Sequence, residues 1–326
     1  MRLLSLFLAL AVLPFTAHAE CAGRNLITAL PTEARVALET AADTAAFAHG
    51  NLWHAIKGAQ HITLIGTFHL SDPRHDATLN ALAPDLKAAR TLLVEAGPAE
   101  EAALKADLAA HPNRLIHHGP TLPESLSPAD WTRLSDALAA RQIPPVFVAR
   151  LQPWYVATLL AISACQFDAM ATAEGLDKRL IKAAQAQNLP IVALEPYDTL
   201  FRIFDAISDT DQTDMLLETL ATSGALEDDT AQTLSDSYFA GESRLFWEFS
   251  RYQILTLPGA DPQKIAHQFD LIETKLMTDR NRAWLPILES QAAKGPLIAA
   301  FGALHLSGQT GILNLLAQNG WVITPW

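Results

Sequence analysis

The amino-acid sequence predicts an α/β protein, a single domain with a largely parallel or mixed central sheet flanked by helices. Several short apolar runs are continuous rather than alternating, as expected for strands covered on both faces. These runs alternate with longer segments in which apolar residues recur about every 3.6 positions, which is typical of helices. Because strands that alternate with helices form sheets with the helices packed outside, one such sheet is expected.

Six strands are expected from the apolar runs. The four continuous runs are ITLI at 62–65, TLLV at 91–94, IVAL at 191–194 and LIAAF at 297–301. A fifth candidate, 146–148, follows Pro144-Pro145, and the last, 321–324, follows the turn signal Asn319-Gly320.

Helices are expected between these strands, at 99–110, 128–140, 176–188, 211–222 and 265–291. Ser127 and Asp261 each precede a proline, which is a common helix start. The apolar segment 156–165 is too short to span a membrane and predicts a buried helix. The helical stretch 200–290 is expected to cover one side of the sheet rather than form a domain of its own.

The composition indicates a globular protein with a large core. The chain has 326 residues, half of them hydrophobic and 18% charged. Its 23 basic and 35 acidic residues give a net charge of −12. This acidity argues against nucleic acid and anionic membrane surfaces as partners.

The first 19 residues have the order of a secretory signal peptide. Arg2 precedes the apolar run 3–13, and Ala17-His18-Ala19 places small residues where a signal peptidase cleaves. We expect cleavage after Ala19, a domain at 20–326, a periplasmic or secreted location, and no stable membrane insertion after cleavage. Cys21 is a poor lipidation site because Glu20, which is not small, precedes it.

Cys21 and Cys165 are the two cysteines of the chain. In an oxidising compartment they could form a disulfide that closes a long loop, or both could stay reduced. The sequence leaves both possibilities open.

Four chemically active side chains follow the four continuous strands. Two strands lead into the same local pattern, G-x-x-H-L-S, which places His69 and His305 three residues after a glycine. The other two strands end at Glu95 and Glu195. Ligand crevices form at the carboxyl edge of such sheets, so these side chains are expected to converge there.

Two histidines and a carboxylate are suited to hold a divalent ion and leave coordination positions open for water and substrate. Such a site can activate water for amide or ester hydrolysis. Each histidine could instead be an ordinary loop residue, and Glu195 could simply be solvated or cap a helix. Glu95 is the better candidate for a ligand or general base. Arg280, in the expected helix 265–291, could bind a substrate carboxylate or a developing oxyanion.

The segments GTFHLSDP, LLVEAGP, LQPWYVATLL, MTDRNRAWLP and FGALHLSGQTGILNLLAQNGWVI resemble the TraB/GumN family. This family is related to the TIKI metalloproteases and, more distantly, to the erythromycin-esterase and ChaN-like proteins. The resemblance implies the erythromycin-esterase/ChaN-like fold. It also implies a site made of the two GxxH histidines, His69 and His305, and a glutamate, Glu95.

The resemblance favours manganese or cobalt as the ion, with zinc or iron also possible. The resulting hypothesis is a metal-dependent hydrolase, most of all a peptidase, with His69, Glu95 and His305 as ligands and Glu95, Glu195 and Arg280 as catalytic groups. Its substrate would be a peptide or a small molecule. The alternative is a non-catalytic periplasmic protein that binds or sequesters a peptide, haem or a metal ligand.

Overall fold

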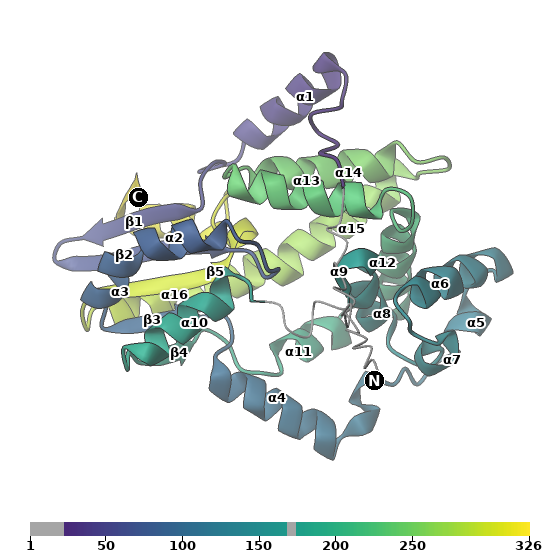
Figure 1. Ribbon diagram of the computed structural model, residues 1–326, viewed down its shortest axis with the longest axis horizontal. Coiled ribbons are helices and arrows are strands. Elements are labelled where there is room, and N and C mark those ends of the chain that lie inside the picture. Colours follow the sequence, from purple (N-terminus) through teal and green to yellow (C-terminus); the bar gives the residue numbers. More distant parts are fainter. Residues whose placement is uncertain (1–22, 168–173) are drawn as a thin grey trace, which may run out of the picture.

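The structure, a computed structural model, describes residues 23–167 and 174–326 (Figure 1). The expected signal peptide and Cys21 lie outside the described residues. Cys165 is not a free thiol, and its pairing with Cys21 stays a prediction. Among the described residues, none of the helices combines the length and apolarity needed to cross a bilayer.

One mixed sheet of six strands forms the centre of the molecule, in the order β4-β3-β5-β2-β1-β6. The strands are β1 Leu52–Lys57, β2 Gln60–Thr67, β3 Thr91–Val94, β4 Ile191–Ala193, β5 Leu297–Gly302 and β6 Val322–Pro325. The strands β4, β3, β5 and β2 pair in parallel, whereas β1 is antiparallel to both β2 and β6. The α/β class and the mixed sheet expected from the sequence are confirmed.

The described residues form the following helices. They are α1 Thr32–Asp43, α2 His75–Ala81, α3 Ala83–Ala88, α4 Pro98–Ala110, α5 Leu122–Ser125, α6 Pro128–Ala140, α7 Pro145–Val148, α8 Pro153–Leu160, α9 Ala164–Phe167, α10 Leu176–Ala186, α11 Thr199–Asp205, α12 Asp209–Ala221, α13 Glu227–Phe239, α14 Ser243–Leu255, α15 Pro262–Ile272, α16 Asp279–Ala292 and α17 Ile312–Gln318, with short 3-10 turns η1 Pro112–Leu115 and η4 Ala303–His305 and a π-helical turn η3 Glu273–Thr278.

Helices cover both faces of the sheet, as the continuous apolar strands require. On one face, Leu64, Leu93 and Phe301 pack against α16 and α17. On the other, Leu92 and Ile298 pack against α2, α3 and α10, which lie in front of the sheet in Figure 1. Successive residues of a strand point to opposite faces, so each central strand contributes to both cores.

The helices α11–α15 do not cover a face of the sheet as expected for 200–290. They lie beyond one end of the strands and form a cap there (Figure 1). Only α16 of that stretch packs on the sheet. The cap has apolar clusters of its own, one around Trp247 and Phe269 and another around Trp154 and Phe204.

Three local expectations were wrong or incomplete. The run 146–148 is the short helix α7, with Val146 and Phe147 largely exposed, because Pro145 starts a helical turn. The strand β1 was not expected. The helix 265–291 is interrupted by the π-helical turn η3 between α15 and α16. The caps were correct, since Ser127 and Asp261 accept hydrogen bonds from the first turns of α6 and α15.

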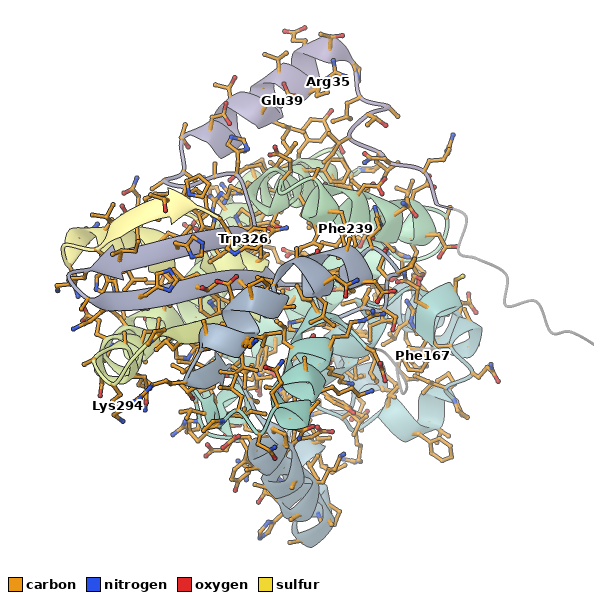
Figure 2. The ribbon with its side chains drawn as sticks, turned by 60° about the vertical axis from the view of Figure 1, so that its left-hand side comes forward. Arg35, Glu39, Phe167, Phe239, Lys294 and Trp326 are labelled. Atoms are coloured by element: carbon orange, nitrogen blue, oxygen red, sulfur yellow. The ribbon has the colours of Figure 1, made fainter. Side chains whose placement is uncertain are left out.

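The helix α1 stands at the periphery and contacts the cap through Leu38, which packs near Phe249 of α14. Figure 2 shows Arg35 and Glu39 on its outer side, directed away from the other helices. Their charged groups are 3.7 Å apart and both are exposed. This ion pair is a surface feature with little effect on stability.

Candidate functional site

The four side chains expected at the sheet edge leave neighbouring parallel strands. Glu195 follows β4, Glu95 follows β3, His305 follows β5 through η4, and His69 follows β2. Because these strands are adjacent and parallel, their carboxyl ends meet at one edge. Arg280 reaches the same place from the first turn of α16.

Arg280 lies at the centre of this group and has no unused N–H. Its Nε and Nη2 donate to the two oxygens of Glu195 at 2.9 and 2.7 Å, and Nη2 also donates to Glu95 Oε2 at 2.5 Å. Its Nη1 donates to the Leu276 carbonyl at 3.1 Å and to His305 Nε2 at 3.2 Å. A guanidinium has five N–H groups, and these bonds use all five.

Glu95 is held as a carboxylate by its surroundings. Its Oε1 accepts from the backbone N–H of Gly302 at 2.7 Å, and its Oε2 accepts from Arg280. Burial alone would raise its pKa, but His305, which is protonated in the acid range where Glu95 titrates, lowers the pKa to about 2 together with Arg280, His69 and the Gly302 hydrogen bond. Glu95 is therefore ionised at neutral pH.

His305 is neutral at neutral pH and fixed in one tautomer. Its Nδ1 lies 2.6 Å from Asn281 Oδ1, which can only accept, so Nδ1 carries the proton and donates. Its Nε2 then holds the lone pair that accepts from Arg280. Burial lowers the pKa of His305 to about 4, with Arg280 adding to the effect and Glu95 opposing it.

His69 differs from the other members because its side chain is 61% exposed. Its Nδ1 lies 3.4 Å from Asp177 Oδ1, an ion-pair distance, and its Nε2 faces the cluster. A Cβ placed on Gly302 would lie 3.9 Å from His69 Nε2, 3.4 Å from Glu95 Oε1 and 3.7 Å from His305 Cδ2. The two histidine rings therefore converge, since neither is farther from this point than 4 Å.

The pKa of His69 is raised above its ordinary value. Burial opposes this, but the Asp177 carboxylate, with a contribution from Glu95, favours the protonated ring. His69 is thus a titratable side chain that faces open space and has a carboxylate behind it. A histidine in this arrangement can accept and return a proton near neutral pH.

Neither glycine of the GxxH patterns has a positive φ, and Gly66 is the one that a close approach requires. A Cβ on Gly66 would lie 2.7 Å from Leu306 Cδ1 and 2.9 Å from Ala303 Cα, so the two GxxH loops pack against each other at this point. The hydroxyl of Tyr238 donates to the Gly66 carbonyl at 3.0 Å, and the rings of Phe68 and Tyr238 stack 5.2 Å apart. Helix α13 thereby holds the loop that carries His69.

Metal binding by His69, Glu95 and His305 stays a prediction. Within 23–167 and 174–326, no group of three or more His, Cys, Asp or Glu side chains is placed to hold a metal ion. Arg280 occupies the position between Glu95, Glu195 and His305, and both ring nitrogens of His305 are hydrogen-bonded. A divalent ion on His69, Glu95 and His305 would have to displace the guanidinium from His305 Nε2.

Glu195 supports Arg280 rather than facing the histidines. Besides its two bonds with Arg280, its Oε2 accepts from Trp284 Nε1 at 3.2 Å. It borders a hollow on the other side of Arg280, together with Thr199 and Arg202. Its side chain is 12% exposed, so it has little access to water or substrate.

A cavity of about 520 Å³ opens over this cluster. His69, Glu95, Arg280 and His305 form its floor, and residues of the GxxH loops, α13, α14 and η3 form its walls. This volume is within the usual range for small-molecule sites, about 300–1,000 Å³. The crevice expected at the carboxyl ends of the strands is present.

Asp177, Asn281 and Tyr238 belong to the site although the sequence did not single out their roles. Asp177 and Tyr238 lie on helices more than a hundred residues from His69 in the chain, and no spacing pattern connects them with it. Asn281 was noticeable only as the neighbour of Arg280. The neighbouring His75 is buried among Phe68, Tyr238 and Phe239, and its Nε2 lies 3.0 Å from the Leu70 carbonyl.

The chain is similar to known proteins over most of its length. The chain is 26% identical over 271 residues to the protein named "Uncharacterized protein YbaP" of Escherichia coli strain K12, covering 81% of this chain and 92% of that protein. The YbaP protein of Shigella flexneri has the same identity and coverage. The model of the TraB/PrgY/gumN family matches residues 51–325, a range that includes every residue of the site. This chain belongs to the TraB/PrgY/gumN family.

Proposed function

We propose that this protein is a hydrolase that cleaves a peptide or ester bond, with His69 as its general base. The observation that carries the proposal is the position of His69, with its Nε2 in the cavity and Asp177 behind its Nδ1. Asp177 orients the ring with the proton on Nδ1, which leaves the Nε2 lone pair free to accept a proton.

In this proposal, a water molecule in the cavity loses a proton to His69 Nε2 as its oxygen attacks the substrate carbonyl. The positive charge that forms on His69 is stabilised by Asp177 and by the ionised Glu95. His69 then returns the proton to the leaving nitrogen or oxygen. Arg280 keeps Glu95 ionised and fixed, and it could contact the oxyanion only by giving up one of its present bonds.

The test is hydrolysis by the purified chain 20–326 of a quenched fluorescent peptide library and of p-nitrophenyl esters. His69→Ala should reduce turnover of a cleaved substrate by about 10²–10⁴-fold, the usual contribution of a general base. His111→Ala is the matched control, because His111 also lies against a carboxylate, 3.0 Å from Asp107, but at the surface just after the end of α4. Equal turnover in the two variants would contradict the role of His69.

The metal-dependent form of the hydrolase is a second candidate, favoured by the convergence of His69, Glu95 and His305 around Gly302. Metal binding at this place requires Arg280 to move away from Glu95 and His305. Added Mn²⁺ should therefore raise the melting temperature only where Arg280 no longer occupies these two side chains. The chain with Arg280→Met, which frees His305 Nε2, should then gain a larger Mn²⁺-induced shift than the wild type. If the Mn²⁺-induced rise in melting temperature is the same in the His305→Ala variant, these side chains are not the ligands.

The alternative of a non-catalytic binding protein is distinguished by the same substrates. A binding protein would retain a peptide or haem without product formation, in wild type and in His69→Ala alike.

We also propose that the protein is exported to the periplasm, because Arg2, the apolar run 3–13 and Ala17-His18-Ala19 have the order of a signal peptide. Amino-terminal sequencing of the periplasmic protein should begin at Glu20, and a start at Met1 would contradict export.

A further inference from the structure

We infer that the substrate carries an uncharged apolar group next to its reacting carbonyl, and that this group fills the cavity above His69. The inference rests on the proposed function, since it names the substrate class of the same site. It follows from the chemical nature of the cavity walls, from the state of the charges on its floor, and from the shape of the enclosure.

The described walls above the floor are mostly apolar. Side chains of Phe68, Leu234, Phe246, Leu276, Met277 and Leu304 line them, from elements that are far apart in the sequence. Trp247 and Leu200 add to this lining, and Leu200 is 45% exposed although it is a large apolar residue.

Among the residues that the structure describes, no wall residue above the floor is charged, and the polar groups there are neutral: Thr67, Tyr238, Ser243 and the indole of Trp247. The Tyr238 hydroxyl is already used by the Gly66 carbonyl. A charged substituent placed against these walls would lose its hydration without finding a counter-ion, which is strongly unfavourable. The walls therefore select against acidic and basic groups.

The floor does not compensate for this. Arg280 is the positive charge that a substrate carboxylate would otherwise seek, but all five of its N–H groups are already engaged. Glu95 is paired with it in the same way. The floor thus offers His69 for proton transfer, while the charges of Arg280 and Glu95 are already paired with each other.

The test measures binding separately from turnover, using the His69→Ala variant and ligands with matched shapes. The acyl series is acetyl-, butanoyl- and octanoyl-glycinamide, together with the glycinamide half-amide of suberic acid, which has the octanoyl length but ends in a carboxylate. The peptide series is acetyl-leucyl-, acetyl-phenylalanyl- and acetyl-aspartyl-glycinamide. Calorimetry gives the dissociation constant of each ligand.

Each buried CH₂ should tighten binding by about fourfold, so octanoyl-glycinamide should bind on the order of 100-fold more tightly than butanoyl-glycinamide. The suberic acid ligand, which ends in a carboxylate, should not bind more tightly than butanoyl-glycinamide. The series with the tighter members identifies the source of the apolar group, an acyl chain or a hydrophobic side chain. Affinity that does not rise with chain length, equal binding of the carboxylate ligand, or no binding in either series would overturn the inference.

Two variants test whether the ligand binds in the cavity. Leu200→Lys should raise the dissociation constant of octanoyl-glycinamide by at least tenfold, because it brings a charge to the wall of the cavity. Leu255→Lys is the matched control, since Leu255 is also exposed, at 39%, but does not line the cavity. If binding follows these expectations while His69→Ala and wild type hydrolyse equally, the inference stands and the proposed role of His69 fails. Equal weakening by the two lysine variants would place the ligand elsewhere.

Discussion

At the scale of single residues, the site is defined by how completely its polar groups are used. Arg280 has five N–H groups in five hydrogen bonds, and its single charge pairs with both Glu95 and Glu195 in a place with little access to water. A buried charge network of this kind is sensitive to the loss of one partner, because the remaining charges stay buried without compensation. His69 is the exception, with one ring nitrogen facing the cavity.

Replacing Arg280 tests this network. We expect Arg280→Met to lower the free energy of unfolding by about 3–5 kcal/mol, because two carboxylates are left without their cation. Arg35→Met, at the exposed pair with Glu39 on α1, should change it by less than about 1 kcal/mol. Urea denaturation of the two variants measures the difference, and similar losses would contradict the central position of Arg280.

Glu218 on α12 should make stability depend on pH. Burial, with a contribution from Asp214, raises its pKa from 4.5 to about 7, although Lys264 opposes this, and its Oε1 is buried without a hydrogen-bond partner in the described structure. The folded state therefore holds this proton more tightly than the unfolded state does. The stabilisation is fully present below pH 4.5 and is lost as the pH rises through about 7.

The variant Glu218→Gln, which cannot ionise, should match the wild type at pH 4.5 and exceed it at pH 8 by roughly 2–3 kcal/mol. Urea denaturation at the two pH values measures this. The exposed Glu39→Gln should show no such difference. A constant gap between wild type and Glu218→Gln at both pH values would refute the assignment.

At the scale of elements, the site depends on helices that hold the loops after the strands. Helix α13 fixes the first GxxH loop through Tyr238, and the start of α10 is tied to it by the bond from the Leu176 N–H to the Phe68 carbonyl, 2.9 Å long. This second contact places Asp177 behind His69. The π-helical turn η3 and the first turn of α16 bring Arg280 and Asn281 to the opposite side.

Removing the hydroxyl of Tyr238 tests the link between α13 and the loop. Tyr238→Phe keeps the stacking on Phe68 but removes the hydrogen bond to the Gly66 carbonyl, so we expect a loss of about 1–2 kcal/mol in stability. It should also lower the turnover number more than it raises KM, because His69 is positioned less well. Tyr252→Phe on the neighbouring helix α14 is the control. Turnover equal to the wild type would show that α13 does not position His69.

At the scale of the whole molecule, the sequence predicted the sheet edge better than the cap. The four continuous apolar runs were predictable as strands because helices cover both faces of the sheet, although β4, at its edge, is only partly buried. Their parallel pairing then brings His69, Glu95, Glu195 and His305 to one edge. The cap was misplaced because amphipathic spacing shows that a helix has a buried face, but it does not show what that face packs against.

The remaining differences have similar physical causes. The strand β1 is bounded by polar and intermediate residues and alternates in burial at its start, so it lacks the continuous apolar signal of its neighbours. The role of Asp177 depends on where α10 begins in space, and that is set by its packing against the His69 loop. The sequence allowed Arg280 to face either solvent or the crevice, and only the fold decides that its charge takes the place where an ion was expected.

We propose that the groups at the sheet edge perform acid–base chemistry through His69, and that the Arg280 guanidinium takes the place where a metal cation was expected. The most direct measurement is the hydrolysis rate of the wild-type chain after its metal content has been brought below stoichiometry by chelation and verified by mass spectrometry. We expect the metal-free wild-type protein to keep its turnover and the His69→Ala variant to lose it. Loss of turnover on chelation, restored by a stoichiometric amount of Mn²⁺ in the wild type but not in His305→Ala, would contradict it.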